Sequence, residues 1–128
     1  MNRSTANLTD AELAAWLEAY GNAWESKLPD AAAALFTEDA LYQETPYAEP
    51  FRGRGEIRDY WARVTADQDG IRFDFSVIST QGTTGVAQWS SKFRSISGDT
   101  QVELNGVFVL EFAESGEVSS LREWWHVR

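Results

Sequence analysis

Apolar residues near the start of the chain recur at three- and four-residue spacing, which is the pattern of an amphipathic helix. This stripe consists of Leu13, Trp16, Leu17, Tyr20 and Trp24. Thr9 and Glu12 stand just before it with the spacing of a capping box, and Asp10 favours the positive end of the helix dipole. The pattern therefore predicts a helix that begins directly after Thr9.

Two more helices are predicted in the first half of the chain. Pro29 and Asp30 begin a short helix that runs through four alanines to about Phe36. A loop with two prolines comes later, and a third helix is predicted after Gly55. Its buried side comprises Ile57, Tyr60, Trp61 and Val64. A short strand is predicted between the second and third helices.

Beyond Gly70 the apolar period changes to strict alternation, which indicates strands. The first of these strands alternates polar residues with Ile71, Phe73, Phe75 and Val77. Further strands, separated by turns that contain glycine, are predicted over residues 86–96, 101–112 and 118–127. Tight turns between long strands predict a twisted antiparallel meander. We therefore expect an α+β domain with its helices packed on one face of a curved antiparallel sheet.

The short strand in the first half carries a chemically distinctive pair of side chains. Tyr42 and Glu44 lie on one face and Gln43 on the other, because side chains alternate along a strand. In an apolar hollow, a carboxyl group beside a phenol has a raised pKa and can carry a proton. The alternative is a strand-end glutamate that faces water or pairs with Arg52 or Arg54.

Composition limits the classes of function. The 128 residues are expected to form one domain, 1–128, with residues 1–8 as a flexible N-terminal tail. A net charge of −9, from 20 acidic and 11 basic residues, argues against nucleic acid and anionic membranes as partners. With no cysteine and a single histidine, His126, we expect neither a thiolate nucleophile nor a metal site. No apolar segment is long enough to span a bilayer, and a cytoplasmic location is expected.

Three segments resemble a known superfamily, namely AALFTEDALY at 33–42, FRGRGEIRDYW at 51–61 and SLREWW at 120–125. At these separations they are similar to nuclear transport factor 2-like domains of the SnoaL-like branch, which includes ketosteroid isomerases and limonene-epoxide hydrolases. The resemblance covers nearly the whole chain. It implies a cone in which a curved sheet and three helices surround a deep apolar pocket, and many members are homodimers. This fold serves isomerases, cyclases, dehydratases, hydrolases and carriers, so it does not by itself identify an activity.

The resemblance to ketosteroid isomerases implies roles for two residues. Glu44 falls where these enzymes keep the carboxylate that shuttles a proton. Tyr20 matches their oxyanion-stabilising tyrosine on the first helix. Their second oxyanion donor, a protonated aspartate, is replaced here by Phe108, so the isomerase set is incomplete.

The resemblance to limonene-epoxide hydrolases implies a different set. Tyr42 and Glu44 stand where those enzymes position a water with a tyrosine and an asparagine, and Glu123 matches their acid–base group on the final strand. Their central arginine and aspartate are replaced by Trp89 and Ser91. This set is incomplete as well, which leaves a proton-transfer site of another kind open.

Glu123 is also a candidate on physical grounds. It shares a strand face with Leu121 and Trp125. If that face is inward, the carboxyl group must be protonated, hydrogen-bonded or paired with a basic group such as Lys92 or Arg94. Two carboxyl groups at one cavity push their pKa values apart, which leaves one as the acid and the other as the base.

Aromatic residues are expected to line the hollow, although each of them fits an ordinary core equally well. Six tryptophans in 128 residues favour a ligand cavity over packing alone. The expected lining residues are Trp16, Trp24, Tyr42, Trp61, Trp89, Ser91, Phe93, Phe108 and Trp125. Tyr20 has two interpretations, a hydroxyl donor to an oxyanion or a buried phenol of the core.

The strand segment 106–110 is apolar on both faces, so each face should be covered. Helices cover one face, and a second subunit is the simplest cover for the other, which predicts a homodimer through the outer sheet face. His126 lies opposite Glu123 on that outer side and is not expected to be catalytic.

The function expected from these residues is binding of a small hydrophobic molecule, with cofactor-free acid–base catalysis. Glu44 is the expected base, and Tyr20, Tyr42 and Glu123 are its expected partners. The alternatives are a non-catalytic ligand-binding module and a dimerisation domain whose interior is filled by its own side chains.

Overall fold

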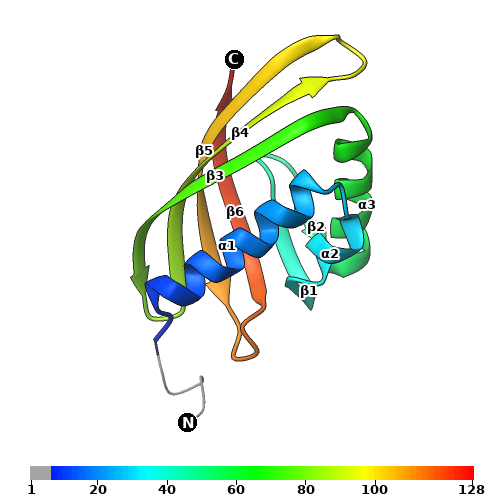
Figure 1. Cartoon of the computed structure of the whole chain (residues 1–128). Helices are drawn as coiled ribbons and strands as arrows, with labels where there is room; N and C mark the ends of the chain where they lie inside the picture. Colours follow the sequence, from blue (N-terminus) through cyan, green and yellow to red (C-terminus); the bar gives the residue numbers. More distant parts are fainter. Residues whose placement is uncertain (1–6) are drawn as a thin grey trace.

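A computed structural model describes residues 7–128 as three helices packed against one curved sheet of six strands. The helices are α1 (Asp10–Glu25), α2 (Pro29–Ala33) and α3 (Gly53–Ala66). The strands are β1 (Phe36–Gln43), β2 (Phe51–Arg52), β3 (Gln68–Gln81), β4 (Thr84–Ser95), β5 (Thr100–Phe112) and β6 (Val118–Val127). Figure 1 shows α1 crossing the inner side of the sheet, with α3 beside it. The expected α+β class is confirmed, and no helix within these residues is long and apolar enough to cross a lipid bilayer.

The strands are hydrogen-bonded in the order β2-β1-β6-β5-β4-β3. The run from β3 to β6 is the expected antiparallel meander. β1 joins the other side of β6 in parallel, with Tyr42 opposite Leu121, which corrects the expectation of an antiparallel sheet at this one pair. The long connection between these strands allows parallel pairing, which a tight hairpin cannot make. As a result, the end of β1 lies next to the final strand.

The helix α1 begins where the capping box predicts. The Thr9 hydroxyl accepts a hydrogen bond from Glu12 N at 3.1 Å, and the Glu12 carboxylate accepts one from Thr9 N at 2.9 Å. The predicted apolar stripe is buried toward the sheet. At the far end of the helix, Glu25 Oε2 accepts a hydrogen bond from the backbone N–H of Phe73 at 2.8 Å. This contact holds α1 against the edge strand β3 and satisfies a donor that the edge leaves unpaired.

Two predicted helix boundaries are wrong. The second helix ends at Ala33 instead of near Phe36, because Phe36 begins β1 and the Leu35 carbonyl accepts a hydrogen bond from Val118 N at 3.0 Å. Pairing with the last strand here overrides the helix propensity of the alanine run. The third helix, expected after Gly55, begins at Gly53 instead.

The expected flexible tail, residues 1–8, lies mostly outside the described residues, which begin at Asn7. Leu8 is only 4% exposed and belongs to the hydrophobic core. Its backbone N–H donates to the Gly82 carbonyl at 2.8 Å, in the turn between β3 and β4. The expected tail therefore does not extend to Leu8.

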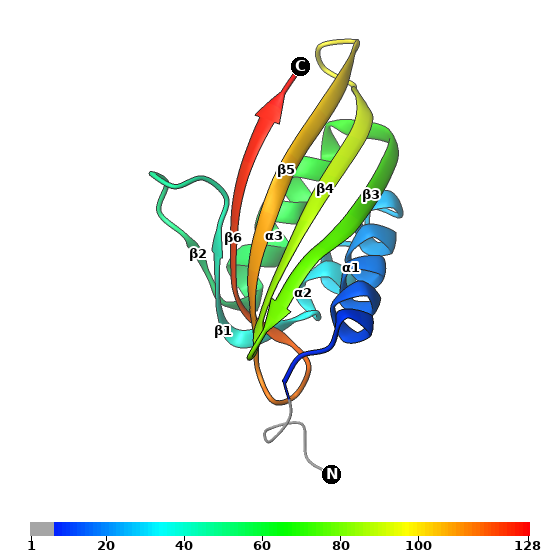
Figure 2. The ribbon, with the colours of Figure 1, turned by 90° about the vertical axis from the view of Figure 1, so that its left-hand side faces the viewer.

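The outer face of the sheet is left uncovered by the three helices, as Figure 2 shows with the strands in front of them. Val107 on β5 and Trp124 on β6 are register partners on this face, and Trp124 is 44% exposed. The Arg122 guanidinium lies 5.6 Å from the centre of the Trp124 ring system. Apolar side chains therefore lie in the middle of an open sheet face.

Candidate active site

A cavity of about 270 Å³ lies between the helices and the inner face of the sheet. Its polar lining residues are Tyr20, Tyr42, Glu44, Tyr60, Gln68 and Glu123. Apolar and aromatic side chains form the rest of the wall, and none of the lining residues is basic. The volume is slightly below the range of about 300–1,000 Å³ that is usual for ligand pockets, which suits a compact apolar molecule.

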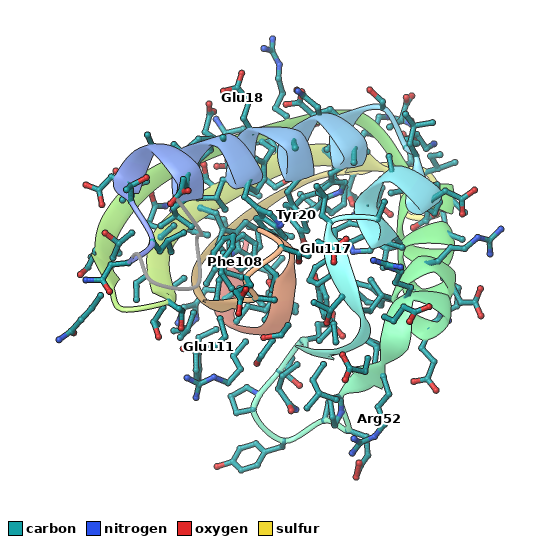
Figure 3. All side chains as sticks on the ribbon, turned by 90° about the horizontal axis from the view of Figure 1, so that it is seen from below. Glu18, Tyr20, Arg52, Phe108, Glu111 and Glu117 are labelled. Carbon is teal, nitrogen blue, oxygen red and sulfur yellow. The ribbon has the colours of Figure 1, made fainter. Side chains whose placement is uncertain are left out.

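Two tyrosine hydroxyls meet at the cavity. Tyr20 extends from α1 and Tyr42 from β1, and their hydroxyl oxygens lie 2.9 Å apart, within hydrogen-bond distance. Figure 3 shows Tyr20 and Phe108 on the inner side of α1, whereas Glu18 points away from it. Burial raises the pKa of both phenols well above the usual value, and a negative charge on Glu123 raises it further. Both phenols are therefore neutral hydrogen-bond donors near pH 7.

Glu123 extends from β6 into the same cluster and is only 5% exposed. Burial raises the pKa of its carboxyl group to about 8, because an apolar site penalises the charged form. A hydrogen bond from Tyr42 opposes this rise, and the nearby charge of Glu44 adds to it. At neutral pH the Glu123 side chain is therefore mostly a protonated carboxylic acid, which can donate a hydrogen bond.

Glu44 lies at a more open part of the cavity than Glu123. It follows β1, which ends at Gln43, so the expectation that Glu44 lies within the strand is wrong. Its side chain is half-buried at the cavity, and its backbone carbonyl accepts a hydrogen bond from Trp125 Nε1 at 3.2 Å. Burial is the main cause of the raised pKa of Tyr60, and a hydrogen bond to the Glu44 carboxylate contributes to it. Glu44 thus reaches both the cavity and solvent.

Neither candidate carboxyl group forms an ion pair within residues 7–128. Arg54, one expected alternative partner of Glu44, instead pairs with Glu117 at 2.9 Å. Arg94, an expected alternative partner of Glu123, pairs with Asp99. Lys92 and Arg94 are both exposed, because they alternate along β4 with the inward-facing residues. The ion-pair interpretations are therefore wrong, and each carboxyl group is hydrogen-bonded to a tyrosine instead, Glu44 to Tyr60 and Glu123 to Tyr42.

Most of the aromatic residues expected at the hollow are at its wall. The lining includes Trp24, Trp61, Trp89, Phe93 and Trp125. Trp16 does not line it, because its indole packs in the core and donates to the Leu35 carbonyl at 3.0 Å. Phe108 is fully buried behind the wall and stacks on Trp89, with ring centres 5.1 Å apart. Ser91 is likewise buried without contributing to the lining.

Sequence reasoning missed two polar lining residues, Tyr60 and Gln68. The helical period places Tyr60 on a buried face. A buried phenol needs a hydrogen-bond partner, and this need could have indicated a polar group near Tyr60. Gln68 begins β3 directly after α3, where neither the helical nor the strand period applies. Val64, Leu104 and Val127 complete the lining.

The arrangement is suited to proton transfer. A carboxylate at one side of the cavity can accept a proton, while a neutral carboxylic acid and two phenols can stabilise negative charge that develops on a ligand oxygen. Within the described part of the chain, no group of three His, Cys, Asp or Glu side chains is placed to hold a metal ion.

The sequence matches the family model of a SnoaL-like domain over residues 17–121. A steroid delta-isomerase from Nocardioides simplex is 26% identical over 115 residues, which make up 90% of this chain and 90% of that protein. The structure of SalBIII, an epoxide hydrolase/cyclase-like enzyme in pyran ring formation of the polyether salinomycin, has a TM-score of 0.79 at 18% identity and covers 94% of this chain and 98% of its own.

A second solved structure is a protein from Catenulispora acidiphila with a ketosteroid isomerase-like fold, in complex with trimethylamine. Its TM-score is 0.75 at 18% identity, with 85% of this chain and 83% of that chain covered. At this identity both structures show a shared fold. The family match extends from α1 into β6 and contains Tyr20, Tyr42 and Glu44. The chain therefore belongs to the family of SnoaL-like domains, with the fold that its three sequence segments predict.

Proposed function

We propose that this SnoaL-like domain binds a small, mostly apolar molecule in its cavity and catalyses cofactor-free proton transfer on it. The observation that carries the proposal is the pair of unlike carboxyl groups at one cavity. Glu123 is buried beside two tyrosine hydroxyls with its pKa raised to about 8, whereas Glu44 is half-buried. Such a pair divides the roles of acid and base between two groups of the same chemical type.

The reaction that fits this arrangement is migration of a double bond in a β,γ-unsaturated ketone. The ketone oxygen accepts hydrogen bonds from the cluster of Tyr20, Tyr42 and Glu123. Glu44 removes a proton from the carbon between the carbonyl and the double bond, and the C–H electrons form a new double bond as the oxygen becomes an enolate. The protonated Glu44 then returns the proton to the far carbon, which restores the carbonyl. The sum is an isomerisation that consumes no other reagent.

The name of the Nocardioides relative, a steroid delta-isomerase, supports this class of reaction. The match to ketosteroid isomerases lacks their second oxyanion donor, because Phe108 stands at that position. Glu123 offers a substitute, since its carboxyl group extends from the neighbouring strand and is protonated at neutral pH. A hydrogen bond to a developing oxyanion is worth about 10²–10³-fold in rate when it is held in place in a dry site.

A non-catalytic ligand-binding module is the second candidate. The half-buried position of Glu44 favours it, because a base that is open to water gains less from desolvation than an enclosed one. A dimerisation domain with a filled interior has less support, since the interior contains a cavity of about 270 Å³.

The test uses two β,γ-unsaturated ketones of different size, cyclohex-3-enone and androst-5-ene-3,17-dione, with conjugation followed by ultraviolet absorbance. We expect the protein to accelerate conjugation and the Glu44→Gln variant to lose about 10²–10⁴-fold in kcat, with little change in the Kd of the conjugated product. The control is Glu18→Gln, because Glu18 is exposed on the far side of α1. Binding without turnover in the wild type supports the non-catalytic module, and unchanged turnover in Glu44→Gln removes Glu44 as the base.

We also propose that the chain forms a homodimer through the outer sheet face. Val107 and Trp124 place apolar surface in the middle of a face that the helices leave open. A second copy that packs the same strands against these residues buries this surface on both partners, as a two-fold interface does.

A further inference from the structure

Gln68 is a buried amide at the cavity with no role in the proton transfer described above. It is only 6% exposed and begins β3, where it pairs in register with Ser95. β3 is one edge of the sheet, and β1, whose end leads into Glu44, lies toward the other edge. Gln68 and Glu44 therefore reach the same cavity from strands that lie on different sides of β6 in the sheet.

The orientation of the Gln68 amide is determined by one hydrogen bond. The indole Nε1–H of Trp24 donates to Gln68 Oε1 at 2.8 Å. An indole N–H can only donate, so the amide oxygen must face Trp24 and the amide nitrogen must point elsewhere. Trp24 is itself held in place, with ring centres 5.0 Å from Trp61 and 5.9 Å from Trp89. The amide group is thus fixed before any ligand binds.

The Gln68 Nε2 group has no hydrogen-bond acceptor among residues 7–128. The indole nitrogens of Trp61 and Trp89 are fully enclosed by protein and have no hydrogen-bond partner. Gln68 Nε2 differs from them, because it is not fully enclosed. Because Gln68 lines the cavity and is otherwise buried, its accessible amide nitrogen is available to a molecule in the cavity. Buried polar groups are almost always paired with protein or water, so a ligand oxygen that takes the place of water here would pair with this donor.

The chemistry of the wall narrows the ligand atom to a neutral acceptor. No lysine, arginine or histidine lines the cavity, and two of its lining residues are glutamates. A carboxylate or phosphate on the ligand would have no cation to pair with and would face negative charge on Glu44. A ketone, ester or ether oxygen accepts a hydrogen bond from an amide N–H without these costs.

We propose that Gln68 is a ligand-binding residue whose Nε2 donates a hydrogen bond to a neutral oxygen of the ligand, at a part of the cavity wall formed by a different strand from the one that leads into Glu44. The ligand class is therefore an apolar molecule with two separated oxygen functions. The identity of the reacting end rests on the proposed function, whereas the contact with Gln68 does not.

The test compares the affinity of two probes that have the same shape. The first is 6-acetyl-2-naphthol, which has a phenol at one end and a carbonyl at the other. The second is 6-isopropenyl-2-naphthol, in which a CH₂ group replaces the carbonyl oxygen. We expect the wild type to bind the acetyl probe about tenfold more tightly in isothermal titration calorimetry, since the isopropenyl probe leaves the amide donor unpaired.

Two variants assign this preference to Gln68. Gln68→Met has a similar volume and no donor, and Gln68→Leu also has no donor and no other polar atom. We expect the affinity ratio of the two probes to fall to about one in both variants. Ser91→Ala is the control, because Ser91 is buried and polar but does not line the cavity, and it should keep the wild-type ratio.

The outcomes separate this proposal from the proposed function. A wild type that binds the two probes equally, or binds neither, contradicts it, as does a preference that persists in Gln68→Met or in Gln68→Leu. If Gln68→Met unfolds, Gln68→Leu alone decides. Loss of turnover in Glu44→Gln has no bearing on the probe ratio, so either proposal can fail while the other stands.

Discussion

Glu123 on β6 lies directly opposite Phe108 on β5 in the register of the two strands. Phe108 is the residue at which the resemblance to ketosteroid isomerases places a missing acid. The carboxyl group that the proposed proton transfer requires is thus present one strand away, and its burial raises its pKa to about 8, which keeps it mostly protonated at neutral pH. An acid in this place can donate to a ligand oxygen together with the neighbouring tyrosines.

The protonated state of Glu123 predicts how stability depends on pH. Its pKa is about 8 in the folded chain against an ordinary value of 4.5, so the native state keeps a proton that the unfolded chain releases between these values. The free energy of unfolding should therefore fall as the pH rises from about 4.5 to about 8, by at most about 1.4 kcal/mol per pH unit.

Urea titrations across this pH range measure the slope. Glu123→Gln keeps a polar group that cannot titrate, so it should flatten the curve. The exposed Glu18→Gln variant should leave the curve as it is in the wild type. Equal slopes in wild type and Glu123→Gln would mean that Glu123 is ionised in the native protein.

Tyr42 should control the pKa of Glu123 directly. Its hydrogen bond lowers the pKa of that carboxyl group, so Tyr42→Phe should move the titration midpoint upward. The same change removes the partner of the Tyr20 hydroxyl, 2.9 Å away, and should cost about 1–3 kcal/mol of stability. Carboxyl ¹³C chemical shifts and urea unfolding report the two effects. Tyr47→Phe is the control, because Tyr47 is exposed. A titration midpoint of Glu123 that falls or stays the same in Tyr42→Phe contradicts the hydrogen bond between Tyr42 and Glu123.

Sequence patterns predict the elements of this fold well where a period is long and uninterrupted. The stripe from Leu13 to Trp24 identifies α1, and alternation identifies the strands of the meander. The patterns fail where a distant partner decides the structure. The alanine run favours a helix, but Phe36 begins β1 instead. The cause is pairing with the last strand, where Val118 N donates a hydrogen bond to the neighbouring Leu35 carbonyl.

The candidate site was predictable to a similar extent. Tyr20, Tyr42, Glu44 and Glu123 all follow from periodicity and family resemblance, and the structure places all four at one cavity. The protonation of Glu123 depends on its burial and its cross-strand neighbours, which no local pattern specifies. Gln68 stands at a helix–strand junction, and its orientation depends on an indole 44 positions away in the sequence.

Gly106 should be essential for the shape of the cavity wall. A Cβ atom at this position would lie 2.5 Å from the Trp124 carbonyl oxygen, 2.8 Å from Trp125 Cβ and 3.0 Å from Trp89 Cε2. Gly106→Ala should therefore destabilise the protein by about 1–3 kcal/mol, because backbone and wall must shift to make room. Gly55→Ala is the matched control, since nothing lies within 4 Å of its Cβ position. Denaturant unfolding measures both, and equal stability of the two variants would contradict the close packing at Gly106.

The homodimer proposal predicts a change in mass on one substitution. Trp124 is 44% exposed on the outer sheet face, and Trp124→Glu would place a charge in the apolar interface. Sedimentation velocity should give a dimer for the wild type and a monomer for Trp124→Glu. Leu28→Glu, an exposed apolar site in the α1–α2 connection, should remain dimeric. A wild type that is monomeric at high micromolar concentration excludes the dimer.

The most direct test of the acid–base cavity is the titration of Glu123 itself, followed through its side-chain carboxyl ¹³C shift in the wild-type protein. A midpoint near 8 is the predicted result, and it would show that a neutral carboxylic acid faces the cavity at physiological pH. A midpoint near the ordinary value of 4.5 would contradict this account, because two ionised glutamates at one cavity cannot divide the roles of acid and base.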